Sequence, residues 1–275
     1  MEILRRGANP WGQEVLIGIG WDLVWLALIL SLAFVVLHPL WVAVRSRGGG
    51  PGEAPDGEAS EEPRAGALPE RIQRHSLAAR AFHWTMSLAM LALLVTAFVP
   101  VLGLQFPWVA IHWIAGLVLL AAVVYHVVHS VLWQDFWSMS FGVRDVREGF
   151  AELRHTMDPR ARPGPRAGKY PADHKLYHHL VVLVTVAALA TGLLMMVRID
   201  TPFWTRNPYL LSDGTWGVLY VVHGLAGVAL IGLVAAHVYF AIRPEKRWIT
   251  WSMIRGWITR DRYLTHHDPD RWVVK

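Results

Sequence analysis

Five histidines of the long apolar segments are the side chains best suited to bind a cofactor: His83, His112, His126, His223 and His237, with His129 just beyond His126. Ionisable side chains are costly within a membrane and usually serve a function there. His223 and His237 are 14 residues apart, which is about 21 Å along one helix and close to a whole number of turns. The two imidazoles therefore leave one face of one helix at two depths.

The depths of the other histidines predict two ligand pairs. His112 and His223 both lie a few residues inside the outer ends of their segments. His83 and His237 both lie near the inner ends of theirs. Two levels of imidazoles from different helices are what two bis-histidine haems require, because each iron takes axial ligands from both sides of a flat macrocycle. His126 follows His112 by the same 14 residues, so spacing alone leaves His83 and His126 as alternative partners for His237.

Two glycines favour a haem interpretation of this pattern. Gly116 lies four residues after His112, and Gly227 lies four residues after His223, both within a shared His-x-x-Ala-Gly pattern. On a helix this spacing puts a patch without a side chain one turn from the imidazole, on the same face. We expect a porphyrin to lie close to Gly116 and Gly227.

The histidines have two other interpretations. A buried histidine can simply bond a helix carbonyl, and a glycine can serve helix packing alone, but the paired arrangement argues against this for the whole set. The alternative from a different functional class is a histidine-lined membrane transporter. Such proteins place carboxylates at mid-membrane, and the four predicted bundle helices contain no Asp or Glu, which favours electron transfer.

The elements that must position these histidines are membrane-spanning helices. Of the 275 residues, 54% are hydrophobic and 17% are charged, which is too apolar for an ordinary soluble domain. A span needs roughly 20 apolar residues, and four charge-free runs are that long: residues 23–44, 81–134, 176–197 and 214–242. Pro100, Gly103 and Pro107 divide the second run into two helices.

We therefore predict an all-α integral membrane protein, a four-helix di-haem cytochrome b bundle plus one extra N-terminal transmembrane helix. The bundle helices are expected at residues 77–101, 108–133, 176–198 and 215–242. The chain has no Cys, which excludes covalent haem attachment and iron–sulfur ligation within it. Two haems of b type are the expected cofactors.

The basic residues predict the orientation. Of 26 Lys and Arg, 22 lie in the segments 45–80, 133–175 and 243–275, and the remaining four are Arg5, Arg6, Arg198 and Arg206. Cytoplasmic flanks keep positive charge, so we expect a bacterial inner-membrane protein with a periplasmic N-terminus and a cytoplasmic C-terminus. The basic balance is thus a topology signal, and we expect lipid contacts and no nucleic-acid partner.

Composition along the chain predicts four segments. An N-terminal anchor transmembrane helix is expected within residues 1–44, a flexible cytoplasmic linker rich in Gly, Pro and Glu at 45–72, the bundle at 73–243 and a cytoplasmic amphipathic tail at 244–275. In the tail, four apolar residues share one helix face and predict a helix lying flat on the membrane surface: Trp248, Trp251, Ile254 and Ile258.

Several of these motifs resemble the gamma, or cytochrome b, subunit of membrane-bound formate dehydrogenase and of related thiosulfate reductase-type molybdenum or tungsten oxidoreductases. The resemblance covers roughly residues 73–272. The residues that carry it are Arg80-Ala-Phe-His83-Trp84, Ile111-His112 with Gly116, Gly168-Lys169-Tyr170 with Lys175, His223 with Gly227, His237, and His266-His267-Asp-Pro269 with Trp272. The extra N-terminal helix departs from the family pattern.

The resemblance implies a ligand set and partners. It implies that His112 and His223 ligate the outer haem and that His83 and His237 ligate the inner haem, which favours His83 over His126. It also implies an iron–sulfur beta subunit on the periplasmic side, and through it a molybdenum or tungsten catalytic subunit. This chain itself contains no substrate-pocket signature, so we expect no catalytic residue of its own.

The resemblance further implies a quinone site beside the inner haem, formed partly by the segment before the third bundle helix. Here Asp173, His174 and Lys175 are the candidate contacts for menaquinone or ubiquinone. The family has amide residues where Pro171 and His174 stand, and a solvated charged turn is the alternative. The predicted function is electron transfer from the partner to quinone; the alternative in the same class is a quinol-oxidising subunit of a terminal reductase.

Overall fold

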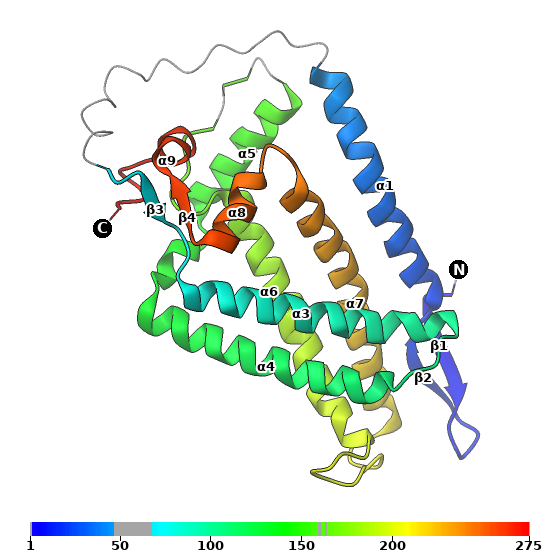
Figure 1. The fold of residues 1–275 in the computed structure, drawn as a ribbon. Helices are drawn as coiled ribbons and strands as arrows, with labels where there is room; N and C mark the ends of the chain where they lie inside the picture. Colours follow the sequence, from blue (N-terminus) through cyan, green and yellow to red (C-terminus); the bar gives the residue numbers. More distant parts are fainter. Residues whose placement is uncertain (1, 47–67, 159–160, 163, 275) are drawn as a thin grey trace. The chain divides into compact units, whose positions relative to one another are not determined.

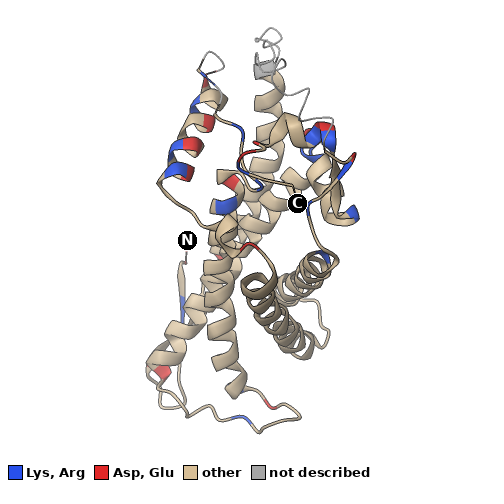
Figure 2. Ribbon diagram, turned by 90° about the vertical axis from the view of Figure 1, so that its left-hand side faces the viewer, with Lys and Arg blue, Asp and Glu red and all other residues tan. Residues whose placement is uncertain are grey.

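The computed structural model describes residues 2–46, 68–158, 161–162 and 164–274. Within them, five helices are long and apolar enough to cross a membrane. The predicted all-α membrane architecture is confirmed, and the predicted bundle helices agree with the structure to within a few residues. Figure 2 shows these helices almost free of charged residues, as a hydrocarbon environment requires.

The elements follow one another as Figure 1 labels them. In chain order the strands and helices are β1 (Leu4–Ala8), β2 (Glu14–Ile19), α1 (Trp21–Ser46), β3 (Arg71–Gln73), α3 (Leu77–Phe98), α4 (Trp108–Trp133), α5 (Val143–Met157), α6 (Ala172–Met195), α7 (Asp213–Ile242), α8 (Arg247–Arg255), β4 (Trp257–Thr259) and α9 (Arg260–His266). Three short 3₁₀ segments follow α3, α4 and α6: Val99–Leu102, Phe136–Met139 and Met196–Arg198.

The turn between α3 and α4 forms where Pro and Gly predicted it. Gly103 adopts φ of 83°, a left-handed conformation that residues with a Cβ avoid. Its amide donates to the carbonyl of Pro100, which closes the 3₁₀ segment at the end of α3. The single apolar run of 81–134 is therefore folded back on itself as two antiparallel spans.

Contacts divide the chain into two compact units, and helices α3, α4, α6 and α7 contribute to both. The described parts of residues 1–36, 82–125 and 180–239 form the first unit, and those of residues 37–81, 126–179 and 240–275 form the second. In the first unit, one apolar core joins the four bundle helices. Ala89 and Met90 of α3 pack with Leu119 of α4 and Leu230 of α7, and Ala188 of α6 lies against them.

The N-terminal region differs from the prediction of a helix alone. Residues 4–19 form an antiparallel hairpin of β1 and β2, and α1 begins only at Trp21. The hairpin lies on the start of α7, because a Cβ added to Gly217 would meet the carbonyl oxygen of Leu16 at 2.9 Å and one added to Gly224 would meet Ile19 at 2.8 Å. The two glycines, seven residues apart, are thus one flat face of α7 on which the hairpin rests.

The first part of helix α1, up to Val36, belongs to the first unit and packs against the bundle helices. Val24 of α1 is buried with Ile19 and with Ile231 of α7, and Phe98 lies against the same cluster. Farther along, the rings of Phe34 and Tyr239 meet edge to face at 5.3 Å. This packing joins α1 to the faces of α3 and α7.

The second unit contains a small folded cap in place of a flat tail helix. Strand β3 pairs with β4, and Ile72, Ile258 and Tyr263 form its buried core with Trp248 beside them. Trp248 and Ile258 are therefore core residues, whereas Trp251 and Ile254 are exposed at 45% each. The four residues do not share one helix face because the chain folds back after α8 at Gly256, whose φ is 93°.

The predicted linker at 45–72 overlaps this cap. Its central residues, 47–67, lie outside the described part of the chain. Arg71 and Ile72, assigned to the linker, are strand residues paired with β4, so the folded part begins earlier than predicted. Helix α5 was also not predicted. It carries Val143, Phe150 and Met157 on an exposed face, and buries Asp145 on the opposite side.

Candidate functional site

Two histidines of the first unit face each other between α4 and α7. The ring centroids of His112 and His223 are 6.1 Å apart. Each ring is backed by a threonine from a third or fourth helix. Thr96 of α3 lies 2.8 Å from His112 Nδ1, and Thr191 of α6 lies 2.9 Å from His223 Nδ1, both measured to Oγ1. All four bundle helices thus contribute to this pair.

These contacts determine which ring nitrogen carries the proton. His223 Nδ1 also lies 3.1 Å from the carbonyl oxygen of Ala188, which can only accept, so Nδ1 is the donor. The Thr96 hydroxyl already donates to the Ala92 carbonyl at 2.6 Å, so it accepts from His112 Nδ1. Both imidazoles therefore keep an unprotonated Nε2, the state that a metal ligand requires.

Small residues bring the helices close to this pair. A Cβ added to Gly192 of α6 would meet His223 Cε1 at 3.2 Å, and one added to Gly227 of α7 would meet Phe98 Cζ at 3.4 Å. At Gly116 the nearest atom, on Leu93, would be 4.0 Å away. Gly116 and Gly227 were predicted to lie near the cofactor; Gly192 was not.

A second pair lies in the same unit. The centroids of His83 on α3 and His237 on α7 are 6.2 Å apart, and the Trp84 ring meets the His83 ring edge-on at 5.1 Å. His83 Nδ1 is buried and has no hydrogen-bond partner within the described part of the chain. A buried, unsatisfied imidazole nitrogen is costly unless a ligand or solvent completes it.

The structure also places the third histidine that spacing had left open. His126 of α4 lies opposite His178 of α6 in the second unit, with ring centroids 6.3 Å apart. Its neighbour His129 lies 3.1 Å from the Gln134 amide. The structure therefore brings His237 to His83 and gives His126 a different partner. The assignment of the ligands themselves stays a prediction.

The first two pairs fit a haem iron. Metal–imidazole bonds are about 2 Å long, and the nitrogen lies about 1 Å from the ring centre, so two imidazoles on opposite sides of one metal ion have centroids about 6 Å apart. The third pair has this spacing too, so the spacing alone does not separate it from the first two; of the described glycines, Gly192 beside His223 is the one whose added Cβ has a histidine of these pairs among its nearest atoms. No group of three or more His, Asp or Glu in the described ranges is arranged to hold a metal ion.

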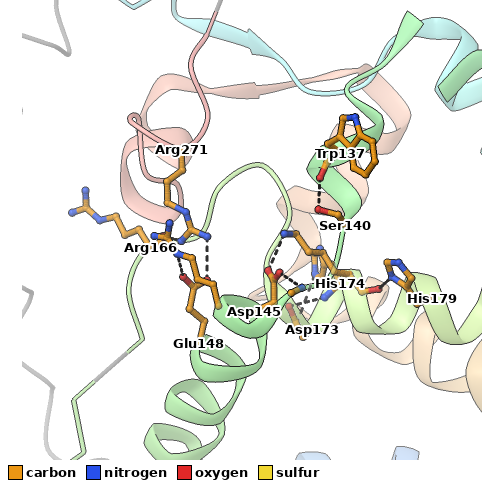
Figure 3. A network of polar contacts seen from close by, with 12 residues as sticks. Trp137, Ser140, Asp145, Glu148, Arg166, Asp173, His174, His179 and Arg271 are labelled. Atoms are coloured by element: carbon orange, nitrogen blue, oxygen red, sulfur yellow. Dashed lines mark hydrogen bonds and ion pairs between the residues drawn. The ribbon is translucent and has the colours of Figure 1, made fainter. Parts of the chain in front are cut away.

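The predicted quinone contacts lie at the start of α6 and belong to a charged network in the second unit (Figure 3). Lys175 Nζ lies 2.8 Å from Asp145 Oδ1; Asp173 lies 3.4 Å from Lys246; and the His174 amide donates to the Asp173 carboxylate. Burial raises the pKa of Asp145, but hydrogen bonds from Lys175 and the Gly142 amide outweigh it and lower the pKa overall. Lys175 is thus engaged with α5, whereas Asp173 and His174 adjoin each other.

The C-terminal segment holds the backbone that leads into α6. His267 Nδ1 donates to the Gly168 carbonyl at 2.7 Å, and its Nε2 accepts from Arg74 at 2.9 Å. Arg271 donates to the Arg166 carbonyl and lies 3.1 Å from Glu148. Burial lowers the pKa of Arg74 to about 10. His267 and Arg271 of the C-terminal segment therefore form a structural clamp on residues 166–168.

Sequence reasoning did not identify Thr96, Thr191 or Gly192. A signal for the threonines existed, because each is a hydroxyl residue within an otherwise apolar run and such residues bond across helices in membranes. Their pairing with His112 and His223 could not be read from the chain, because it depends on which helices are neighbours.

Comparison with known proteins identifies the family. Residues 74–256, more than half of the chain, match the model of the prokaryotic cytochrome b561 family. A search of the curated proteins gave no match. The matched segment contains all three histidine pairs, and the family implies b-type haem, which histidines hold without covalent bonds. The chain therefore belongs to the prokaryotic cytochrome b561 family and is a multi-pass membrane b-type cytochrome with an electron-transfer role.

Proposed function

We propose that this chain is the di-haem membrane subunit of a respiratory oxidoreductase and carries electrons between an iron–sulfur partner subunit and the quinone pool. The observation that carries the proposal is the pair of facing imidazoles at each of two levels of α7, with centroids 6.1 and 6.2 Å apart. A bound haem b supplies a reversible one-electron couple at each pair. Two such sites on one helix divide the width of a membrane into short transfers.

The residues of the chain have separate roles in this proposal. His112 with His223, and His83 with His237, hold the two irons. Thr96 and Thr191 fix the first pair of rings in the tautomer with a free Nε2 and keep their planes from turning. Such outer-shell partners typically change metal affinity by about 10–100-fold. Gly192 and Gly227 leave space beside the His112–His223 pair.

The proposed orientation follows from the basic residues. The connections with 22 of the 26 Lys and Arg would face the cytoplasm of a bacterial inner membrane. The His112–His223 pair then lies toward the periplasm, where an iron–sulfur beta subunit of a formate dehydrogenase-like molybdenum or tungsten enzyme would dock. Electrons moving inward oppose a potential that is negative inside by about 2.3 kcal/mol per 100 mV.

We assign the quinone reaction to the second unit. Asp173 and His174 lie at the start of α6 beside Lys246, and they are groups that can bond a quinone oxygen and deliver a proton to it. The Lys175–Asp145 ion pair and the clamp of His267 on Gly168 would keep this turn in place.

The haem stoichiometry tests the proposal. The purified chain in detergent is expected to give sharp alpha and Soret bands and two haems b per polypeptide in a haemochrome assay. His223→Ala should remove one haem and leave the other. His83→Ala should remove the other haem, and His126→Ala is the matched control that should retain both.

Other outcomes would change the assignment in defined ways. A folded, fully loaded preparation without haem would refute the electron-transfer proposal and return the histidines to transport or packing. Loss of a haem in His126→Ala with both retained in His83→Ala would make His126 the ligand. Retention of both haems in His223→Ala would refute the His112–His223 site.

A further inference from the structure

One cation of the first unit has a position that the haem ligands do not explain. Arg198 ends the 3₁₀ segment after α6, and its guanidinium lies 5.2 Å from the ring centroid of Trp216. Its Nη1 donates to Tyr220 Oη at 2.6 Å. Trp216 is 1% exposed, and its ring stacks near Tyr220 at 6.5 Å, so the guanidinium is held against two aromatic rings of α7.

Arg198 has no carboxylate within ion-pair distance in the described ranges. The nearest acidic residues in the sequence are engaged elsewhere: Asp200 lies 3.7 Å from Arg206, and Asp213 accepts from the Asn9 amide at 3.0 Å. A guanidinium has five N–H donors, and one of those of Arg198 has a hydrogen bond here. A half-buried cation at the end of a membrane helix is costly without a counter-anion.

This cation contacts a residue that lies one turn from His223 on α7. Tyr220 precedes His223 by three residues, which puts it on the same side of α7. Arg198 follows Thr191, which contacts His223, by seven residues and lies in the 3₁₀ segment directly after α6. Arg198 and Tyr220 therefore flank the path from the imidazole pair toward the α6–α7 connection.

We propose that Arg198 and Tyr220 form the binding site for a propionate carboxylate of the haem held by His112 and His223, and that this contact raises the reduction potential of that haem. This inference rests on the proposed ligand pair. Haem b carries its propionates on one edge, and a planar guanidinium is the side chain best matched to a carboxylate. The Tyr220 hydroxyl accepts from Arg198 and so keeps its own O–H to donate to the same group.

The positive charge of Arg198 determines the direction in which it changes the reduction potential of this haem. Reduction lowers the charge of the haem by one, so a nearby fixed cation stabilises the reduced form over the oxidised form. The low dielectric of a membrane interior strengthens the effect. Removing the cation should therefore lower the potential of this haem and leave the haem at His83 and His237 unchanged.

The test is a redox titration of the purified holoprotein followed by optical and EPR spectra. The haem absent from His223→Ala identifies which signal belongs to the His112–His223 pair. Arg198→Gln should change the ratio of reduced to oxidised forms of that haem about tenfold at a given potential, which is about 59 mV for a one-electron couple. Arg198→Lys keeps the positive charge and should leave the potential of that haem close to its native value. Arg206→Gln, which removes an exposed cation paired with Asp200, is the matched control and should shift neither haem.

The outcomes separate this inference from the proposed function. If Arg198→Gln does not fold, Tyr220→Phe removes only the hydroxyl and should lower the same potential by a smaller amount. Normal haem content with unchanged potentials in both variants would overturn the propionate site while leaving the ligand pair intact. If His223→Ala loses no haem, the proposed ligand pair fails first.

Discussion

At the scale of single residues, the His223 ring is held more tightly than a packing histidine needs to be. Its Nδ1 bonds both the Thr191 hydroxyl and the Ala188 carbonyl, and Gly192 lets α6 approach its Cε1 edge. His112 has a corresponding hydroxyl partner in Thr96. Two rings from different helices are thus fixed in the same tautomer, which is the arrangement of an orienting outer shell around a metal site.

Gly192→Ala tests this arrangement. The new Cβ would lie 3.2 Å from His223 Cε1, so the ring must shift by a few tenths of an ångström from its present position beside Thr191. We expect haem at the His112–His223 pair to be retained roughly tenfold less tightly, because outer-shell changes cost about 10–100-fold in affinity. The measurement is haem retained per polypeptide on transfer to apomyoglobin.

Gly232→Ala is the matched control for this change. Gly232 lies on α7 with no described atom within 4 Å of an added Cβ, so both haems should be retained as in the native chain. Equal haem retention in the two variants would show that α6 does not position the His223 ring.

At the scale of elements, the N-terminal hairpin and α7 depend on each other through two glycines. Gly217 faces Leu16, and Gly224 faces Ile19, while the Asn9 side chain donates to Asp213 at the first turn of α7. A residue with a side chain at either glycine would push the hairpin away from the helix that carries His223 and His237. The hairpin is therefore a support for α7.

Gly217→Ala should loosen the hairpin. The added Cβ would lie 2.6 Å from Leu16 Cβ and 2.9 Å from its carbonyl oxygen, and backbone cannot move aside as a flexible side chain can. Overpacking of this kind costs about 1–3 kcal/mol. We expect a lower unfolding temperature in detergent and faster proteolytic cleavage of the turn at residues 9–13.

The control for the hairpin experiment is Gly214→Ala. Gly214 lies in the same first turn of α7 and has open space where a Cβ would stand. Its cleavage rate should match that of the native chain. If Gly217→Ala is also cleaved at the native rate, the hairpin does not depend on close contact with α7.

At the scale of the whole molecule, residues distant in sequence are joined by a clamp that depends on a neutral histidine. His267 donates to Gly168 and accepts from Arg74, and it is 1% exposed. Burial, and after it the Arg74 cation, lower the pKa of His267 from 6.5 to about 4. Protonation would put a second positive charge against Arg74 and remove the acceptor that Arg74 uses.

The sign of the pH effect follows from this lowered pKa. The unfolded chain binds a proton near pH 6.5 and the folded chain only near pH 4, so the contribution of His267 to stability is complete above pH 6.5 and is lost between pH 6.5 and 4. The loss is on the order of 3 kcal/mol at most. Hydrogen exchange in residues 166–170 and 257–272 should therefore accelerate as the pH falls through this window.

His267→Gln removes the titration while keeping a donor and an acceptor. In this variant the exchange rates, corrected for the intrinsic pH dependence, should be flat across the same window. An equal acceleration in the native chain and the variant would assign the effect to another group.

Much of this protein could be predicted from its sequence, because spans and their histidines are local properties. Apolar runs of the length of a bilayer must be helices, since no other structure satisfies their backbone within one segment. The five spans, the turn at Gly103 and the two depths of His223 and His237 follow from composition and helix periodicity. The family resemblance then favoured His83 over His126.

Only the tertiary structure decided what depends on which helices are neighbours. Thr96 and Thr191 reach the histidine rings across helix contacts, His126 faces His178, and residues 4–19 form a hairpin because α7 offers a flat glycine face. The tail folds into a cap because Ile72 lies against Ile258. Each of these contacts joins residues far apart in the chain, and helix periodicity carries no information on such pairs.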